Sequence, residues 1–169
     1  GGYMNIGYLP DSFGFNAQLP TILKNCGIDS VIFFRGINFD TQVSSPYFVW
    51  KGLSDREVLG VNLLKGYGAA AFLEDGEGYI NNKLIPLTRL LKGKSNLPEV
   101  IIPVGEDQMD IVRDLPEKLD SISLKTSDQY EISSYERFMD FLQGQQSLET
   151  YEGEFREPCL SRIHKTIAS

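Results

Sequence analysis

The first part of the chain alternates short apolar runs with an amphipathic stretch, and this order restricts the folds open to it. Residues 6–9 and 31–34 are apolar runs of strand length, and each is followed by a polar, glycine-containing turn. Between them, residues 17–26 have helical character, with Asn16 at the expected N-cap and Gly27 at the expected C-terminal cap. Strand, turn, helix and strand in this order predict an α/β fold with parallel strands.

The rest of the chain adds a hairpin and further helix and strand patterns. Two apolar runs, 47–50 and 58–61, flank a polar turn and predict an inserted β-hairpin. Helices are predicted from periodicity, and from a capping box at Ser133 and Glu136, over 80–91, over 115–124 and after Ser133. Further strands are predicted at 100–104, 130–132 and 152–155. The predicted sheet is therefore mostly parallel, with one inserted hairpin.

Composition excludes several classes of protein. Apolar residues make up 41% and charged residues 23% of the 169 residues, which is usual for a globular domain and unlike a disordered or collagen-like chain. The 16 basic and 23 acidic residues give a net charge of −7, and the acidic excess is spread over both halves. Because phosphate binding needs clustered Lys and Arg, we expect no nucleic acid and no anionic membrane as a partner. No apolar run approaches the roughly 20 residues of a membrane span.

Two cysteines and one histidine limit the metal and redox chemistry. Cys26 and Cys159 lie far apart, without metal-type spacing, and are predicted to be buried thiols, although one disulfide stays open. So few cysteines favour a reducing compartment, and with no signal-peptide pattern we expect a cytoplasmic protein. Because His164 is the one histidine, this chain cannot build a multi-histidine zinc site by itself.

Three polar residues follow predicted strands, in or beside glycine-containing loops: Asp11, Arg35 and Asp107. Because parallel strands end at a common edge, we expect the three side chains at one rim, where α/β folds bind ligands. Two carboxylates and an arginine suffice for glycoside hydrolysis, with one carboxylate attacking the sugar and the other protonating the leaving oxygen. The arginine would hold the nucleophile ionised and oriented. Structural alternatives stay open, because Asp is common in turns and at N-caps, and Arg35 could be a solvated strand end.

The segment Gly-Tyr-Leu-Pro-Asp-Ser-Phe-Gly at residues 7–14 resembles the Pro-Asp-x-Phe-Gly segment of the α-mannosidases of glycoside hydrolase family 38. Weaker similarities follow in order along the chain. The sequence Phe-Arg-Gly at 34–36 resembles the family's next strand, 48–59 its aromatic hairpin, and 104–108 its Gly-x-Asp segment. Residues 153–165 resemble the bacterial members, so the similarity covers nearly the whole chain.

This resemblance implies a retaining α-mannosidase whose catalytic domain is a (β/α)7-barrel with one zinc ion. It implies that Asp11 is both nucleophile and zinc ligand, that Asp107 is the general acid/base, and that Arg35 lies near the nucleophile. Glu106 is the poorer acid/base candidate, and Tyr67 aligns loosely with an active-site tyrosine. The substrate would be an α-mannoside or a mannose-containing oligosaccharide. A carboxylate bound to zinc stays ionised, as a nucleophile must.

The sequence departs from the family pattern at the metal site. The family takes zinc ligands from a His-x-Asp segment upstream and a His-Asp segment downstream; neither occurs here, so this chain supplies one of four expected ligands. His164 stands in neither position and is interpreted as a structural or surface residue. We therefore expect residues 1–169 to be a single fragment of a catalytic domain, incomplete at both ends, weak in zinc binding and inactive alone. The rest of the parent chain, or self-association, would cover apolar surface.

Two other functions stay open. One is a related metal-dependent carbohydrate hydrolase or deacetylase, in which Asp11 binds metal or acts as a base, and the other is a non-catalytic carbohydrate-binding or interaction module. The remaining conspicuous residues have structural interpretations. Trp50 is typical of cross-strand packing, and residues 74–78 form a solvated loop without calcium-ligand spacing. The apolar stripe of Tyr135, Phe138, Met139 and Leu142 is typical of a helix facing the core.

Overall fold

The structure, a computed structural model, describes residues 4–157. The chain divides into two compact units. The first unit is formed by residues 1–64 together with 135–169, and the second by residues 65–134. Cys159 and His164, and the predictions made for them, lie outside the described residues.

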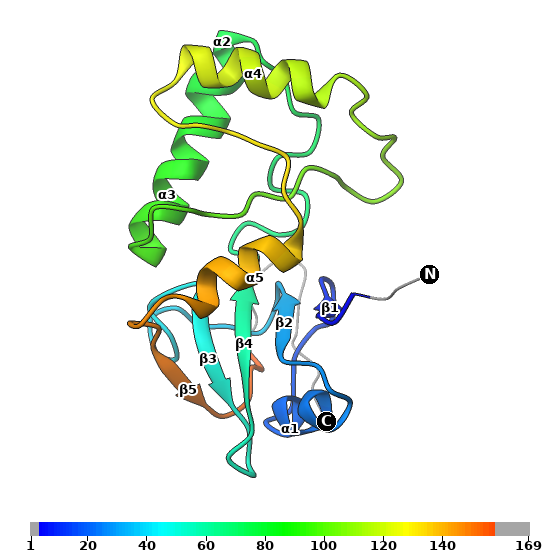
Figure 1. Ribbon diagram of the computed structural model, residues 1–169, viewed down its shortest axis with the longest axis vertical. Helices are drawn as coiled ribbons and strands as arrows, with labels where there is room; N and C mark the ends of the chain where they lie inside the picture. The colour runs from blue at the N-terminus through cyan, green and yellow to red at the C-terminus, as the bar shows by residue number, and fades with distance from the viewer. Residues whose placement is uncertain (1–3, 158–169) are drawn as a thin grey trace. The chain divides into compact units, whose positions relative to one another are not determined.

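The first unit contains a five-stranded sheet in the order β1-β2-β4-β3-β5 (Figure 1). Its strands are β1 (Gly7–Leu9), β2 (Ser30–Phe33), β3 (Tyr47–Lys51), β4 (Glu57–Asn62) and β5 (Thr150–Glu152). β1, β2 and β4 are parallel, β3 is antiparallel to β4, and β5 is parallel to β3. The predicted mostly parallel sheet with one inserted hairpin is therefore confirmed, and the last strand begins two residues and ends three residues earlier than predicted.

The helix α1 (Leu19–Asn25) makes the crossover that parallel neighbours β1 and β2 require. The prediction of an N-cap at Asn16 is wrong. The Asn16 side chain instead accepts a hydrogen bond from the backbone N–H of Gln18 at 2.9 Å, which is an Asx turn ahead of the helix. At the other end, Gly27 adopts a φ of +74° and terminates the helix as predicted.

Cys26 lies at the C-terminal end of α1 and is an exposed free thiol. The prediction of a buried thiol at this position is therefore wrong. The helix buries its other face through Pro20 and Leu23, and at Cys26 the helical repeat ends, so the thiol is not carried onto that face.

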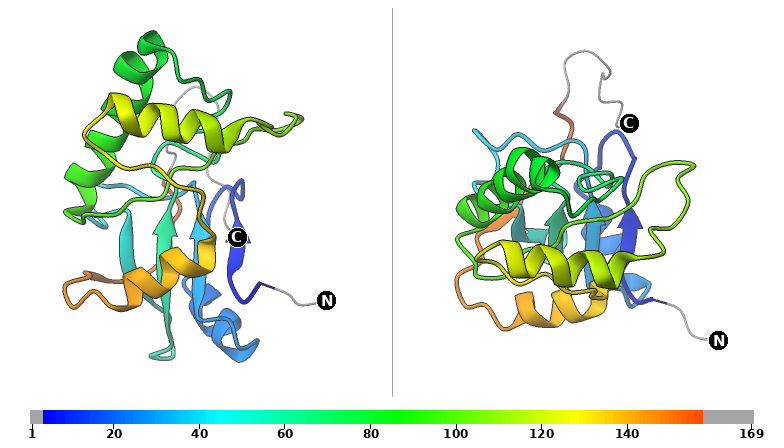
Figure 2. Two further views of the ribbon diagram at one scale, coloured as in Figure 1. Left: turned by 45° about the horizontal axis from the view of Figure 1, so that its top comes forward. Right: turned by 90° about the horizontal axis from the view of Figure 1, so that it is seen from above.

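Successive side chains of each strand point to opposite faces of the sheet. Both faces are covered. On one face, Val31 and Phe33 belong to an apolar cluster with Leu23 of α1. On the other face lies α5 (Tyr135–Gln143), which crosses the strands in Figures 1 and 2. The Phe138 ring packs on Tyr47 of β3, with 5.1 Å between ring centroids.

The predicted apolar stripe of α5 is confirmed. Phe138, Met139 and Leu142 are buried. Tyr135 is half-buried beside Tyr8 of β1, with 5.5 Å between ring centroids. Burial, followed by a side-chain hydrogen bond with Tyr8, raises the pKa of the Tyr135 hydroxyl far above its ordinary value.

Trp50 lies at the centre of an aromatic cluster and is fully buried. Its ring centroid is 5.7 Å from that of Phe33 and 4.7 Å from that of Phe155. Its indole Nε1 donates to the carbonyl oxygen of Gly153 at 2.9 Å. The interpretation of Trp50 as a packing residue is confirmed, and the cluster joins the sheet to a segment about 100 residues further along the chain.

The second unit is built from helices and irregular segments. The predicted helix over 80–91 is confirmed and extends further at both ends, as α2 (Glu77–Tyr79), the π-helical turn η1 (Ile80–Leu84) and α3 (Ile85–Ser95). The π-helical turn η1 has a local cause, because Pro86 has no N–H to donate to the carbonyl four residues before it. α4 (Leu115–Lys125) matches the predicted helix over 115–124, and Leu84 and Ile122 belong to the shared apolar cluster.

Two predicted strands of the second unit are wrong. Residues 100–104 are irregular and half-buried, not a buried strand. Pro103 has no N–H for a sheet ladder, and its carbonyl instead accepts from Ala70 N–H at 3.0 Å. Residues 130–132 are irregular as well, and Tyr130 N–H donates to the Ser123 hydroxyl at 3.0 Å. Neither segment therefore forms a sheet ladder.

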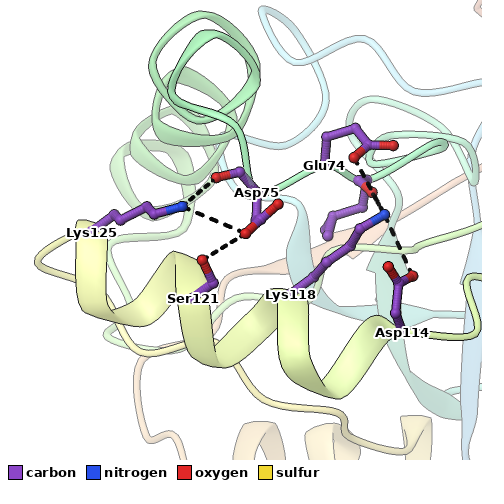
Figure 3. Close-up of polar contacts among 7 residues, drawn as sticks. Glu74, Asp75, Asp114, Lys118, Ser121 and Lys125 are labelled. Carbon is purple, nitrogen blue, oxygen red and sulfur yellow. Dashed lines mark hydrogen bonds and ion pairs between the residues drawn. The ribbon is translucent and has the colours of Figure 1, made fainter.

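Of the predicted loop at 74–78, residues 74–76 form a loop, whereas Glu77 and Gly78 begin α2; the loop is held against α4 by side chains of that helix (Figure 3). The Ser121 hydroxyl donates to Asp75 Oδ2 at 2.6 Å, and Lys125 Nζ donates to the Asp75 carbonyl at 2.8 Å. One turn earlier, Lys118 Nζ reaches Glu74 Oε2 at 3.3 Å. The loop carboxylates are thus paired with helix donors, which agrees with the interpretation of a loop without calcium chemistry.

Among residues 4–157, no helix has the length and apolarity needed to cross a membrane.

Replacing Trp50 by Phe tests the aromatic cluster. Trp50→Phe keeps an aromatic ring but leaves the half-buried Gly153 carbonyl without its indole donor, so we expect a loss of about 0.5–1.5 kcal/mol in unfolding free energy. Urea unfolding followed by circular dichroism measures this loss. A variant as stable as the parent would show that the indole hydrogen bond contributes nothing net.

Replacing Ser121 by Ala tests the contact between the acidic loop and α4. The hydrogen bond from Ser121, aided by Lys125, lowers the pKa of Asp75. The ionised Asp75 therefore stabilises the fold above the pKa that it has in the unfolded chain, and this stabilisation is lost as the pH falls through its lower pKa in the folded chain. In Ser121→Ala we expect the pKa of Asp75 to rise, as measured by an NMR carboxyl titration. The exposed Ser127→Ala is the control, and an unchanged Asp75 pKa in Ser121→Ala would contradict the assignment.

Candidate functional site

Asp11 and Arg35 are brought together by the parallel pairing of β1 with β2. Leu9 and Phe33 are register partners at the ends of these strands, and Asp11 and Arg35 each lie two residues further on. Arg35 Nε donates to Asp11 Oδ1 at 2.7 Å, and Arg35 Nη2 lies 2.5 Å from the same oxygen. The prediction that these two side chains share one edge of the sheet is therefore confirmed.

The Arg35 guanidinium lies over two aromatic rings. Its central carbon is 4.8 Å from the Phe13 ring centroid and 5.0 Å from that of Phe34. The Arg35 side chain is only 12% exposed, whereas that of Asp11 is 47% exposed. Arg35 Nη1 is buried and has no hydrogen-bond partner among the described residues, so the aromatic faces and Asp11 compensate its charge. The arrangement presents an accessible carboxylate on a rigidly held cation.

The backbone on which Arg35 sits is fixed from the neighbouring strand. The side-chain amide of Asn62, a buried residue at the end of β4, donates to the Phe34 carbonyl at 2.7 Å. The next residue, Leu63, donates its N–H to the Phe33 carbonyl at 2.7 Å. The structural alternative of Arg35 as a solvated strand end is wrong, because aromatic rings and a carboxylate enclose its side chain. Sequence reasoning missed Phe13, Phe34 and Asn62, since aromatic and amide residues near an arginine are common.

Asp107 belongs to the second unit and lies in a turn. The turn is closed by the N–H of Met109, which donates to the Glu106 carbonyl at 3.3 Å, and Gln108 adopts a φ of +56°. The Tyr67 hydroxyl donates to Asp107 Oδ2 at 3.1 Å. Because no strand precedes this turn, Asp107 does not lie at a strand end as predicted. The alternative of Asp107 as an N-cap is also wrong, since α4 begins only at Leu115.

Glu106 is turned toward the loop that carries Tyr67. Its carboxylate lies against Gly68, where a Cβ atom would clash with Oε2. Glu106 Oε1 also accepts from the N–H of Asp107 at 3.2 Å. Tyr67, Gly68, Glu106 and Asp107 therefore form one polar cluster within the second unit.

The described residues do not form a zinc site by themselves. Asp11 offers a carboxylate, but residues 4–157 contain no group of three or more His, Cys, Asp or Glu side chains placed to hold a metal. Zinc in proteins usually has three or four protein ligands, so a single carboxylate leaves most of its coordination to other groups.

A shallow hollow of about 310 Å³ lies elsewhere on the first unit, between strands β3 and β4 and the end of α5 with the residues that follow it. Leu59, Leu142 and Gln146 are among the residues that line it, and none of the predicted site residues does.

Comparisons with known proteins bear on the whole chain. The model of the glycosyl hydrolases family 38 N-terminal domain matches residues 1–154. A putative mannosylglycerate hydrolase of Halalkalibacterium halodurans is 25% identical over 124 residues, covering 68% of this chain and 14% of that protein. Alpha-mannosidase 2C1 of Mus musculus is 39% identical over 54 residues, covering 31% of this chain and 5% of that protein.

A solved structure resembles the fold. The alpha-mannosidase from Enterococcus faecalis V583 superposes with a TM-score of 0.82 at 17% identity, covering 93% of this chain and 18% of that chain. The chain thus spans less than a fifth of the length of each of these proteins. Because the family match extends over most of its residues, the chain belongs to glycosyl hydrolases family 38 and matches the N-terminal domain of that family.

Proposed function

We propose that this chain is part of the catalytic domain of a retaining α-mannosidase, in which Asp11 is the nucleophile. The observation that carries the proposal is the ion pair between Asp11 and the enclosed Arg35 at the ends of two parallel strands, in a chain of this family. The relatives' names support a mannose-containing substrate. The rest of a (β/α)7-barrel would come from the longer parent chain, which would cover apolar surface left exposed on this part.

Asp11 and Arg35 have complementary roles in this proposal. A nucleophilic carboxylate must be ionised and aimed at the anomeric carbon. Arg35 supplies two nitrogens to Oδ1 of Asp11, and the rings of Phe13 and Phe34 restrict the guanidinium. The accessible carboxylate forms a covalent bond to the anomeric carbon as the glycosidic C–O bond breaks.

Asp107 is the proposed general acid/base. It gives a proton to the leaving oxygen, and it then takes a proton from the water that releases the sugar from Asp11. The Tyr67 hydroxyl, which donates to Oδ2, orients the Asp107 carboxyl. Glu106 is the weaker candidate, because its carboxylate packs on Gly68 and on the Asp107 N–H.

We assign Asp11 to a zinc site as one ligand, with the remaining ligands supplied by the parent chain. The zinc ion would bind the Asp11 carboxylate and sugar hydroxyls. The exposed Cys26 thiol supports a reducing compartment such as the cytoplasm for the parent enzyme.

Azide rescue in the full-length parent enzyme distinguishes the two carboxylates. Asp11→Ala should lower kcat by about 10⁴-fold or more. Added azide then attacks the anomeric carbon directly and gives the β-mannosyl azide, of inverted configuration. Asp107→Ala, with an activated aryl leaving group, should give the α-mannosyl azide, of retained configuration. The exposed Asp40→Asn is the control. Near-normal turnover by Asp11→Ala would remove Asp11 from the nucleophile role.

A zinc titration tests the assignment of one ligand to this chain. Because one carboxylate holds zinc weakly, we expect residues 1–169 to show no stoichiometric tight site by calorimetry, and the parent enzyme to show one that Asp11→Asn weakens. A tight, stoichiometric site in the 169-residue chain would contradict the assignment.

A further inference from the structure

Residues 153–157, named the strap, are anchored to the aromatic cluster that surrounds Trp50. The Gly153 carbonyl accepts from Trp50 Nε1 at 2.9 Å. The Glu154 carbonyl accepts from the Tyr151 hydroxyl at 3.1 Å and from Gln42 Nε2 at 3.2 Å. The Phe155 side chain is fully buried. Because Trp50 and Tyr151 belong to β3 and β5, their two contacts hold the strap on the sheet itself.

The strap pairs its backbone with the two loops that carry Asp11 and Arg35. Phe155 exchanges two hydrogen bonds with Phe15, at 2.8 and 3.0 Å, four residues after Asp11. Glu157 N–H donates to the carbonyl of Gly36 at 2.9 Å, directly after Arg35. Two strap residues thus bridge two loops that are also joined by the Asp11–Arg35 ion pair and by the contact of the Phe13 ring with Arg35.

Gly36 is where the strap and the Arg35 loop come closest. Gly36 has a φ of +96°, and a Cβ atom at this position would lie 2.7 Å from the Phe155 carbonyl oxygen. Any side chain at residue 36 must therefore push the strap and the loop apart. The neighbouring residue in sequence is Arg35, so such a displacement acts directly on the guanidinium.

We propose that the strap is a positioning element for the Asp11–Arg35 pair, with Gly36 and Glu157 as its positioning residues. An ion pair with one half-exposed partner contributes little by itself to holding two loops together. Backbone pairing to a segment fixed by the aromatic cluster restricts both loops before substrate binds. The effect of the strap on catalysis rests on the proposed function. Its effect on the geometry of the Asp11–Arg35 pair rests only on the contacts given above.

The test uses the matched pair Gly36→Ala and Gly27→Ala in the 169-residue chain. Both glycines lie in the first unit at positive φ, but a Cβ atom at Gly27 meets nothing within 4 Å. Both variants therefore bear backbone strain, and only Gly36→Ala displaces the strap. By NMR, we expect the Arg35 Nε–H to exchange with water at least tenfold faster in Gly36→Ala than in Gly27→Ala. Equal exchange rates in the two variants would overturn the proposal.

A milder pair keeps the test decisive if Gly36→Ala does not fold. Glu157→Pro removes the N–H that donates to Gly36, whereas Glu157→Ala retains it. We expect faster Arg35 Nε–H exchange in the proline variant alone, with β2 and β4 amide protection unchanged in both. Unchanged Arg35 exchange in Glu157→Pro would overturn the proposal.

Kinetics of the parent enzyme separate this proposal from the proposed function. There, Gly36→Ala should lower kcat at least tenfold while KM changes less, and Gly27→Ala should leave both unchanged. If the parent has no mannosidase activity but Gly36→Ala still speeds Arg35 Nε–H exchange, the proposed function is overturned and the positioning role stands. If the parent is active but Gly36→Ala leaves Arg35 Nε–H exchange unaltered, the positioning role is overturned and the proposed function stands.

Discussion

The parallel pairing of β1 with β2 is the constraint on which the candidate site depends. Leu9 and Phe33 are register partners, so the residues two positions further along each strand emerge side by side. A slip of one residue would turn Asp11 or Arg35 to the opposite face. The register is secured by Val31 and Phe33, which are fully buried in the core of the first unit. Packing of apolar side chains therefore decides that a carboxylate and a guanidinium meet at this edge.

Burying most of an arginine side chain carries a cost that the surroundings must offset. Asp11 supplies the countercharge, and the rings of Phe13 and Phe34 supply polarisable faces. Asn62 and the strap restrain the backbone on either side of Arg35. The rigidity of the pair thus arises from three separate parts of the chain, and a preorganised carboxylate is what covalent glycoside chemistry requires.

The second unit shows how side-chain donors substitute for a sheet. Its loops lack strand neighbours, and buried backbone carbonyls must still be satisfied. Lys83 donates to the Ala71 carbonyl at 3.1 Å, and Lys118 to the Leu73 carbonyl at 3.2 Å. These contacts hold the segment that follows Tyr67, and Tyr67 in turn contacts Asp107. The acid/base candidate is therefore supported by side-chain hydrogen bonds, whereas the nucleophile candidate is supported by strand register.

Local patterns in the sequence determined the first strand–helix–strand unit, the hairpin, the buried stripe of α5 and the meeting of Asp11 with Arg35, because each follows from periodicity and turn chemistry over a few residues. They failed at 100–104 and 130–132, where a strand-like sequence adopts irregular structure and its backbone bonds to a loop or to a helix side chain, and at Cys26, whose exposure depends on where its helix ends. Only the tertiary structure decided that Phe13 and Phe34 enclose Arg35 and that the strap joins the two loops. Those contacts bring together residues as much as 140 positions apart, and no short-range pattern encodes a neighbour at such a distance.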